Sequence, residues 1–206
     1  MNAHKHAELS VKRRGGSIED YYPIHFFMDS TKELCSDNRH RILHNLWGIR
    51  RVVIPIFGAS IINSDGKTIN VKDVCEQDHI LPDYRNRFIP TLADFVDAVQ
   101  EDQLDLNGLE RVLKYYEDDP EMTQLLLSPL ALTGQIKSLL ITHNSWFLNA
   151  VVPRVLERKA TIRTFEFAPE DLFSNMAFRT WMDNGQGIPR SAKNIDKIVS
   201  TGIIQN

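Results

Sequence analysis

Residues 30–55, STKELCSDNRHRILHNLWGIRRVVIP, decide the expected architecture. Ser30 and Glu33 have the spacing of a capping box, in which the hydroxyl accepts from a helical N–H and the glutamate reaches back. Pro55 lacks an N–H and is expected to end a helix. The stretch therefore predicts one helix over 31–54, with an apolar stripe of Cys35, Ile42, Leu46, Ile49 and Val53 toward the core.

The opposite face of this predicted helix is polar, and it carries Glu33, His40, His44, Trp47 and Arg51. His40 and His44 are four residues apart, which places two imidazoles on one helical face at a spacing suited to a shared metal ion. Two interpretations stay open. The face is exposed to solvent, or it lines a cleft that His25 or His79 completes from a flanking loop.

The rest of the chain predicts a mainly α (α+β) fold with a helical core. Ile61 and Ile62, the Asp65-Gly66 turn and the alternation over 67–71 predict a β-hairpin at about 58–71. Residues 75–89 read as a polar loop around Pro82. A capping box at Thr91 and Asp94 begins another helix. Beyond a break at 101–107 we expect helices at 108–117, 121–127 and 130–159 (interrupted by Pro153), a short strand at 162–167, a helix after Pro169 and a loose tail from Asp183.

This organisation suggests a domain over 1–100 and a helical extension over 101–206, which either stands apart or packs on the first as one unit. The apolar stretch 139–152 suits a central core helix or an oligomer contact. We expect a protein partner or self-association through this C-terminal half.

Composition excludes several classes of protein. The net charge is −3 over 206 residues, which argues against nucleic-acid binding, and no apolar run is long enough to span a membrane. Cys35 and Cys75 are too few for a disulfide framework and form no C-x-x-C pair. Metalloprotease, nucleophile-elbow and phosphate-loop signatures are absent, and so is the His-Asp dipeptide of one phosphohydrolase class.

From about His6 to Phe95 the chain resembles an uncharacterised family of small bacteriophage and bacterial proteins with no assigned activity. The resemblance is carried by His6, Ser10, Gly15-Gly16, Glu19-Asp20-Tyr21, Ile24-His25, Asp29-Ser30, Lys32, Arg39-His40-Arg41, His44, Gly48-Ile49, Phe57-Gly58, Ile62-Asn63-Ser64-Asp65-Gly66-Lys67, Val71, Glu76-Gln77, Ile89-Pro90-Thr91 and Asp94. It implies a viral protein, located in the host cytoplasm or within a virion.

The chain departs from the family pattern at two places. The family has consecutive histidines where this chain has His44-Asn45, and a Glu-Gln-His run where it has Glu76-Gln77-Asp78-His79. If these histidines form a metal or catalytic centre, this chain has lost a ligand or moved it by one residue.

Two main functions follow from these observations. In the first, the chain is a phage-encoded binding or structural protein, a virion component or a modulator of a host system, with a structural His/Arg cluster. In the second, it is a metal-assisted or histidine-based hydrolase of a phosphate-containing substrate. The catalytic candidates are then His40, His44, Glu76 and His79. His40 and His44 are the candidate ligands of a divalent metal, and Lys32, Arg41 and Arg51 are the candidate anion-binding residues.

Overall fold

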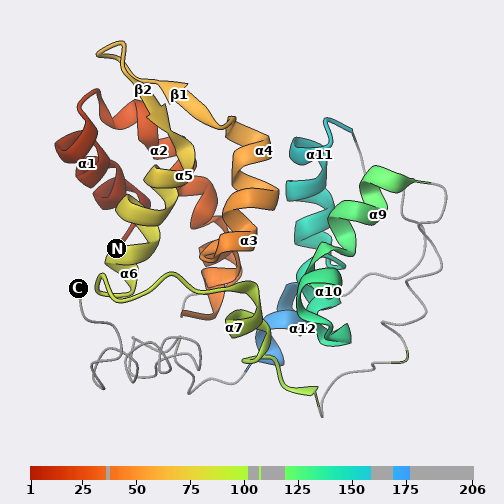
Figure 1. Cartoon of the computed structure of the whole chain (residues 1–206). Coiled ribbons are helices and arrows are strands. Elements are labelled where there is room, and N and C mark those ends of the chain that lie inside the picture. The colour runs from red at the N-terminus through yellow and green to blue at the C-terminus, as the bar shows by residue number, and fades with distance from the viewer. Residues whose placement is uncertain (36–37, 102–106, 108–118, 159–168, 177–206) are drawn as a thin grey trace, which may run out of the picture.

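A computed structural model describes residues 1–35, 38–101, 107, 119–158 and 169–176. The fold is mainly helical with one two-stranded antiparallel hairpin, as predicted. Helices α1 (Ala3–Arg14) and α2 (Ile18–Met28) pack against each other at one side of the molecule (Figure 1). Among the described residues, no helix is both long enough and apolar enough to cross a bilayer.

The prediction of one helix over 31–54 is wrong. The stretch forms two 3₁₀ segments, Ser30–Glu33 and Asn38–Leu43, and then a helix made of α3 (Leu46–Gly48), a π-helical segment (Ile49–Val53) and α4 (Ile54–Phe57). The capping box at Ser30 does not form, and the hydroxyl of Ser30 is buried without a hydrogen bond. Instead, Asn45 begins the helix, because its side chain accepts from the N–H of Gly48 at 2.9 Å.

Proline residues do not end helices here as expected. Pro55 lies inside the helix that runs on to Phe57, and the predicted loop around Pro82 is a helix made of α5 (Val71–Asp73), a π-helical segment (Val74–Ile80) and α6 (Leu81–Asp83). Each π-helical segment lies directly before the turn with the proline. The wider turn shifts the carbonyl groups that the proline ring would otherwise meet.

The hairpin at 58–71 is confirmed. Strand β1 (Ser60–Ile62) pairs with β2 (Thr68–Asn70), with Ser60 opposite Asn70. Gly66 has a φ of 75°, as the tight turn requires. Two carboxylates attach this turn to the connection between α1 and α2, because Asp65 accepts from the N–H of Gly16 and Asp20 accepts from that of Ser64.

The remaining described elements are α7 (Leu92–Val96), α9 (Pro120–Leu126), α10 (Ser128–Thr133), α11 (Val152–Val155) and α12 (Pro169–Ser174), together with a 3₁₀ segment (Ile136–Ile141) and a π-helical segment (Phe147–Val151). The predicted capping box at Thr91 and the helix after Pro169 are both present. Pro153 lies in the helix of Phe147–Val151 and α11 and does not interrupt it. The predictions for 108–117, 162–167 and the tail from Asp183 fall outside the described residues.

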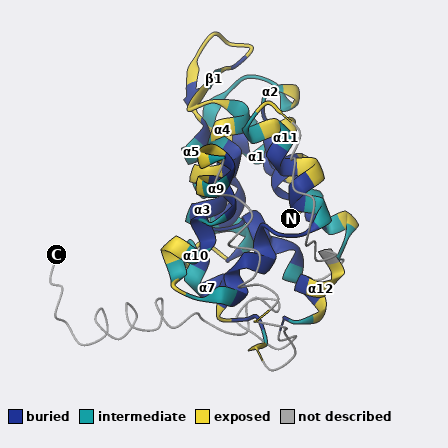
Figure 2. Ribbon diagram, turned by 90° about the vertical axis from the view of Figure 1, so that its right-hand side faces the viewer, coloured by how far each residue is buried: buried dark blue, intermediate teal, exposed yellow. Residues whose placement is uncertain are grey.

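One hydrophobic core joins residues from both halves of the sequence. Helices α3 and α4 lie between the α1, α2 and α5 group and the α9 to α11 group (Figure 1), and the buried residues line the facing sides of these helices (Figure 2). Trp47 stacks on Phe147 at 6.0 Å between ring centroids and donates a hydrogen bond to the hydroxyl of Ser128 at 2.8 Å. Most apolar residues of the stretch 139–152 are buried in this core, whereas Trp146 is half-buried and Ala150 is exposed.

A close backbone contact at Gly48 holds the histidine-bearing 3₁₀ segment against the helix that follows. A Cβ atom built at Gly48 would lie 2.4 Å from the carbonyl oxygen of Leu43. We therefore expect Gly48→Ala to destabilise the protein by about 2 kcal/mol or more, although alanine normally stabilises a helix.

Urea unfolding measures this change, and Gly66→Ala is its control. A Cβ at Gly66 meets nothing within 4 Å, so the control loses only the roughly 1 kcal/mol of a left-handed backbone conformation. Equal losses in the two variants would contradict the close contact at Gly48.

Candidate metal centre

Four side chains from separate parts of the N-terminal half converge in the interior. Asp29 caps the end of α2, His44 follows the second 3₁₀ segment, and His79 and Asp83 lie on the helix of α5 and α6. One potential ligand atom from each lies within 4.8 Å of the others. Asp29, His44 and His79 are at most 6% exposed, and the side chain of Asp83 is 2% exposed.

The spacing of these atoms suits a metal ion. The two Nε2 atoms of His44 and His79 are 2.9 Å apart, and Oδ1 of Asp29 lies 3.5 Å from each of them. Oδ2 of Asp83 lies 3.4 Å from Nε2 of His44. Ligand atoms at about 2.1 Å from an ion are about 3.4 Å apart in a tetrahedron and about 3.0 Å apart as octahedral neighbours. The observed distances cover this range.

Asp29 also lacks the hydrogen bonds that a buried carboxylate needs. Neither of its oxygens accepts a hydrogen bond, although Nζ of Lys32 lies 2.6 Å from Oδ2. Nδ1 of His44 is another buried atom without a hydrogen bond. Buried charge is normally compensated by hydrogen bonds, ion pairs or metal ions. Lys32 compensates Oδ2 of Asp29, and a cation bound among the four ligand atoms would also compensate Oδ1.

The two carboxylates of the centre remain ionised. Burial alone would raise the pKa of each, but the adjacent imidazoles have the larger combined effect and lower both values. The centre therefore holds two negative charges in a region from which water is largely excluded.

A buried chain of hydrogen bonds orients His79. Ser10 has one hydroxyl hydrogen, which it donates to Oδ2 of Asp78 at 3.0 Å, so Nε2 of His25 must donate to Ser10 at 2.9 Å. Burial, followed by the charge of His6, lowers the pKa of His25 to about 3, so its Nδ1 carries no hydrogen at pH 7.

This atom accepts from Nδ1 of His79 at 2.9 Å. Burial also lowers the pKa of His79, so its Nε2 presents a lone pair to His44 and Asp29. Metal-binding histidines commonly have this arrangement, in which the second ring nitrogen donates a hydrogen bond away from the metal.

Asp78 anchors this chain of hydrogen bonds. Its side chain is fully buried and accepts from Arg13 at 2.9 Å and from Nε of Arg14 at 2.5 Å, in addition to Ser10. Asp78 is also the residue that separates Gln77 from His79 and interrupts the Glu-Gln-His run of the family pattern. The π-helical segment Val74–Ile80 contains it, and a π turn holds one residue more than an α turn. His79, one residue later than the histidine of the family pattern, lies in the centre.

Of the residues predicted as ligands or catalytic groups, His44 and His79 belong to the four-ligand centre, His40 lies beside it and Glu76 does not contact it. His40 is 5% exposed and lies beside the centre, with its Nε2 3.9 Å from Oδ1 of Asp29. The prediction that His40 and His44 share a polar helix face is wrong, because the backbone leaves helical geometry at Arg41 between them. Glu76 pairs with Lys72 at 2.6 Å and makes no described contact with the four ligand residues.

Two of the three predicted anion-binding residues lie at the centre. Lys32 pairs with Asp29, and a guanidinium nitrogen of Arg41 lies 4.0 Å from Oδ2 of Asp83. Arg51 lies elsewhere, on a separate pocket of about 350 Å³ that is also lined by Trp47 and Leu92.

Sequence reasoning missed Asp29 and Asp83 as ligands. A signal for both is present, because each lies four residues after a histidine that belongs to the same buried cluster, His25 and His79. On a helix this spacing places the two side chains of each pair on one face. The signal at Asp83 was hidden by the interpretation of Pro82 as a loop residue.

Comparison with known proteins identifies a family and no activity. No curated protein and no solved structure gives a significant match to the chain. The family described as Domain of unknown function (DUF6915) matches residues 1–104, which include every residue of the centre. The chain belongs to this family of unknown function.

Proposed function

We propose that the chain binds a divalent transition-metal ion at Asp29, His44, His79 and Asp83 and hydrolyses a phosphate-containing substrate there. The observation that carries the proposal is the set of four buried ligand atoms at metal-ligand spacing, with an Asp29 carboxylate that accepts no hydrogen bond. Two imidazoles and two carboxylates suit zinc, manganese or iron(II) better than magnesium or calcium, which prefer oxygen ligands alone.

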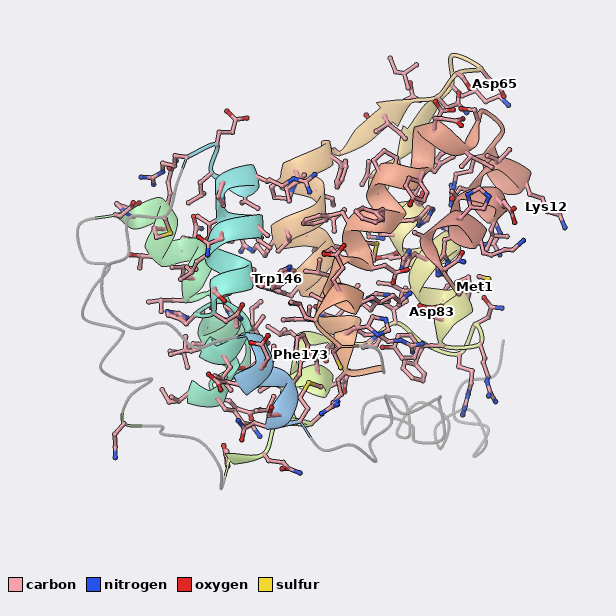
Figure 3. All side chains as sticks on the ribbon, turned by 180° about the vertical axis from the view of Figure 1, so that it is seen from behind. Met1, Lys12, Asp65, Asp83, Trp146 and Phe173 are labelled. Atoms are coloured by element: carbon pink, nitrogen blue, oxygen red, sulfur yellow. The ribbon has the colours of Figure 1, made fainter. Side chains whose placement is uncertain are left out.

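The class of substrate follows from the charges around the centre. Lys32, whose side chain is 34% exposed, contacts the Asp29 carboxylate and donates a hydrogen bond to the carbonyl oxygen of Met1 at 3.0 Å. The ammonium group of Met1 pairs with Asp83, and Figure 3 shows Met1 and Asp83 next to each other. The partly exposed groups that contact these two carboxylates are therefore cations. Such an edge attracts an anionic substrate.

Hydrolysis needs both a metal ion and the positive side chains. A bound divalent ion supplies a Lewis acid that polarises a phosphoryl oxygen and lowers the pKa of water. Lys32 and Arg41 are close enough to the carboxylates to balance the negative charge of the centre and of an incoming phosphate. His79, held by His25, keeps its lone pair directed at the centre.

The binding or structural role that was also expected from the sequence remains a separate prediction. The expectation of self-association rested on the apolar stretch 139–152, most of whose apolar residues are buried within one chain.

Metal analysis tests the proposal first. Protein produced without a histidine tag and without chelators should contain about one equivalent of zinc, manganese or iron, or should bind one on addition, as measured by plasma mass spectrometry after gel filtration. The loaded protein should then hydrolyse p-nitrophenyl phosphate or a nucleotide. Folded protein that binds none of these metals would contradict metal binding, and loaded protein without hydrolysis would contradict the catalytic part alone.

A further inference from the structure

A further histidine, His6, lies against the centre and is not one of its four ligands. Its side chain is fully buried, and its ring stacks on that of His79 with 3.9 Å between centroids. Nδ1 of His6 lies 2.8 Å from the carbonyl oxygen of Asp78. A carbonyl oxygen only accepts, so Nδ1 carries the hydrogen. This carbonyl is available because the residue four positions further on is Pro82, which has no N–H.

This hydrogen bond determines what the other ring nitrogen presents. With Nδ1 donating to the Asp78 carbonyl, Nε2 is the ring atom that faces the centre, and it is buried without a hydrogen bond. It lies 3.3 Å from Oδ1 of Asp83. Nε2 of His6 and Oδ1 of Asp83 are therefore two buried potential ligand atoms at the spacing of neighbouring metal ligands.

Asp83 directs its two oxygens toward different imidazoles. Oδ1 lies near His6, and Oδ2 lies 3.4 Å from Nε2 of His44, inside the four-ligand centre. The ammonium group of Met1 also pairs with Oδ1, so this oxygen already attracts positive charge. A carboxylate with this orientation can bind one ion through each oxygen.

We propose a second cation site at Nε2 of His6 and Oδ1 of Asp83, with Asp83 bridging two ions. The inference rests on the proposed function and extends it, because paired ions about 3.5–4 Å apart stabilise both the attacking and the leaving oxygens of a phosphoester. It identifies the substrate class as a phosphate ester that both ions contact. Of the two positions, the one at His6 has fewer protein ligands and should bind more weakly.

Titration with manganese(II) tests the second site directly. Metal-depleted wild-type protein should bind two equivalents, the second more weakly, and the doubly loaded protein should show the electron paramagnetic resonance signal of an exchange-coupled pair. His6→Phe keeps the ring and its volume without a ligand atom, and it should bind one equivalent and lose the coupled signal. His6→Gln, which can still donate to the Asp78 carbonyl, provides a second variant in case the first does not fold.

The matched control is His4→Gln on the same helix, where the side chain of His4 is 55% exposed and should not affect either ion. One equivalent in wild-type protein would contradict the second site and leave the first site intact. Two equivalents in both His6 variants would contradict the role of His6. Loss of both ions from these variants would assign His6 to the first site and would also overturn the inference. Failure of wild-type protein to bind any manganese would contradict the second site, and failure to bind zinc and iron(II) as well would contradict the proposed function.

Discussion

Asp78→Ala should lower the free energy of unfolding by about 3 kcal/mol, because it leaves the largely buried Arg14 and the buried Ser10 without their acceptor. Asp78 is fully buried and accepts hydrogen bonds from Arg13, Arg14 and Ser10. The loss should be visible as a lower midpoint in urea unfolding monitored by circular dichroism.

Glu8→Ala is the control for this change. Glu8 is an exposed carboxylate on the same helix as Arg13 and Arg14, and it pairs with Lys5 at 2.9 Å. Surface ion pairs contribute at most about 1 kcal/mol, so the control should unfold almost like the wild type. Equal effects of the two substitutions would mean that Asp78 does not anchor the buried network.

His44→Ala should weaken metal binding by at least about 100-fold. Loss of a residue that only orients a ligand weakens metal affinity by about 10- to 100-fold, and His44 is itself one of the ligands. Nε2 of His44 lies 2.9 Å from that of His79 and within 3.5 Å of both carboxylates, so its removal takes away one of the four ligand atoms. Competition with a fluorescent chelator measures the affinity.

His40→Ala is the matched comparison, since His40 lies four residues before His44 and is also buried. Its Nε2 is 3.9 Å from Oδ1 of Asp29, and it is not one of the four ligands. The affinity should fall by about tenfold or less. A larger loss in His40→Ala than in His44→Ala would show that the ligand set has been assigned incorrectly.

The sequence predicted the local elements whose signals need only neighbouring residues. The hairpin depends on the Asp65-Gly66 turn, and the helix of α7 depends on the capping box of Thr91 and Asp94, and both are present. The long helix over 31–54 failed because a competing signal was overlooked. Asn45 caps the helix that actually forms, and Ile42 of the predicted stripe is buried from a 3₁₀ segment instead.

The candidate site was predicted in part for a related reason. His44 and His79 were named as candidates, and the structure places their Nε2 atoms side by side. Asp29 was not considered, because its role depends on how α2 packs against the other elements, which periodicity does not reveal. Asp83 was missed because a proline was assumed to end the helix, and a π-helical segment that admits a proline has no simple signature in one sequence.

The separation of the ligands along the chain also determines how metal and folding depend on each other. Asp29 and Asp83 come from elements more than 50 positions apart, and His44 lies between them in the sequence. No short peptide of this protein could reproduce the centre, because it exists only when these elements have docked. A bound ion would act as a reversible cross-link among three segments. The resistance of the N-terminal half to proteases would then be governed by how slowly the ion dissociates, as well as by the strength of the hydrophobic core.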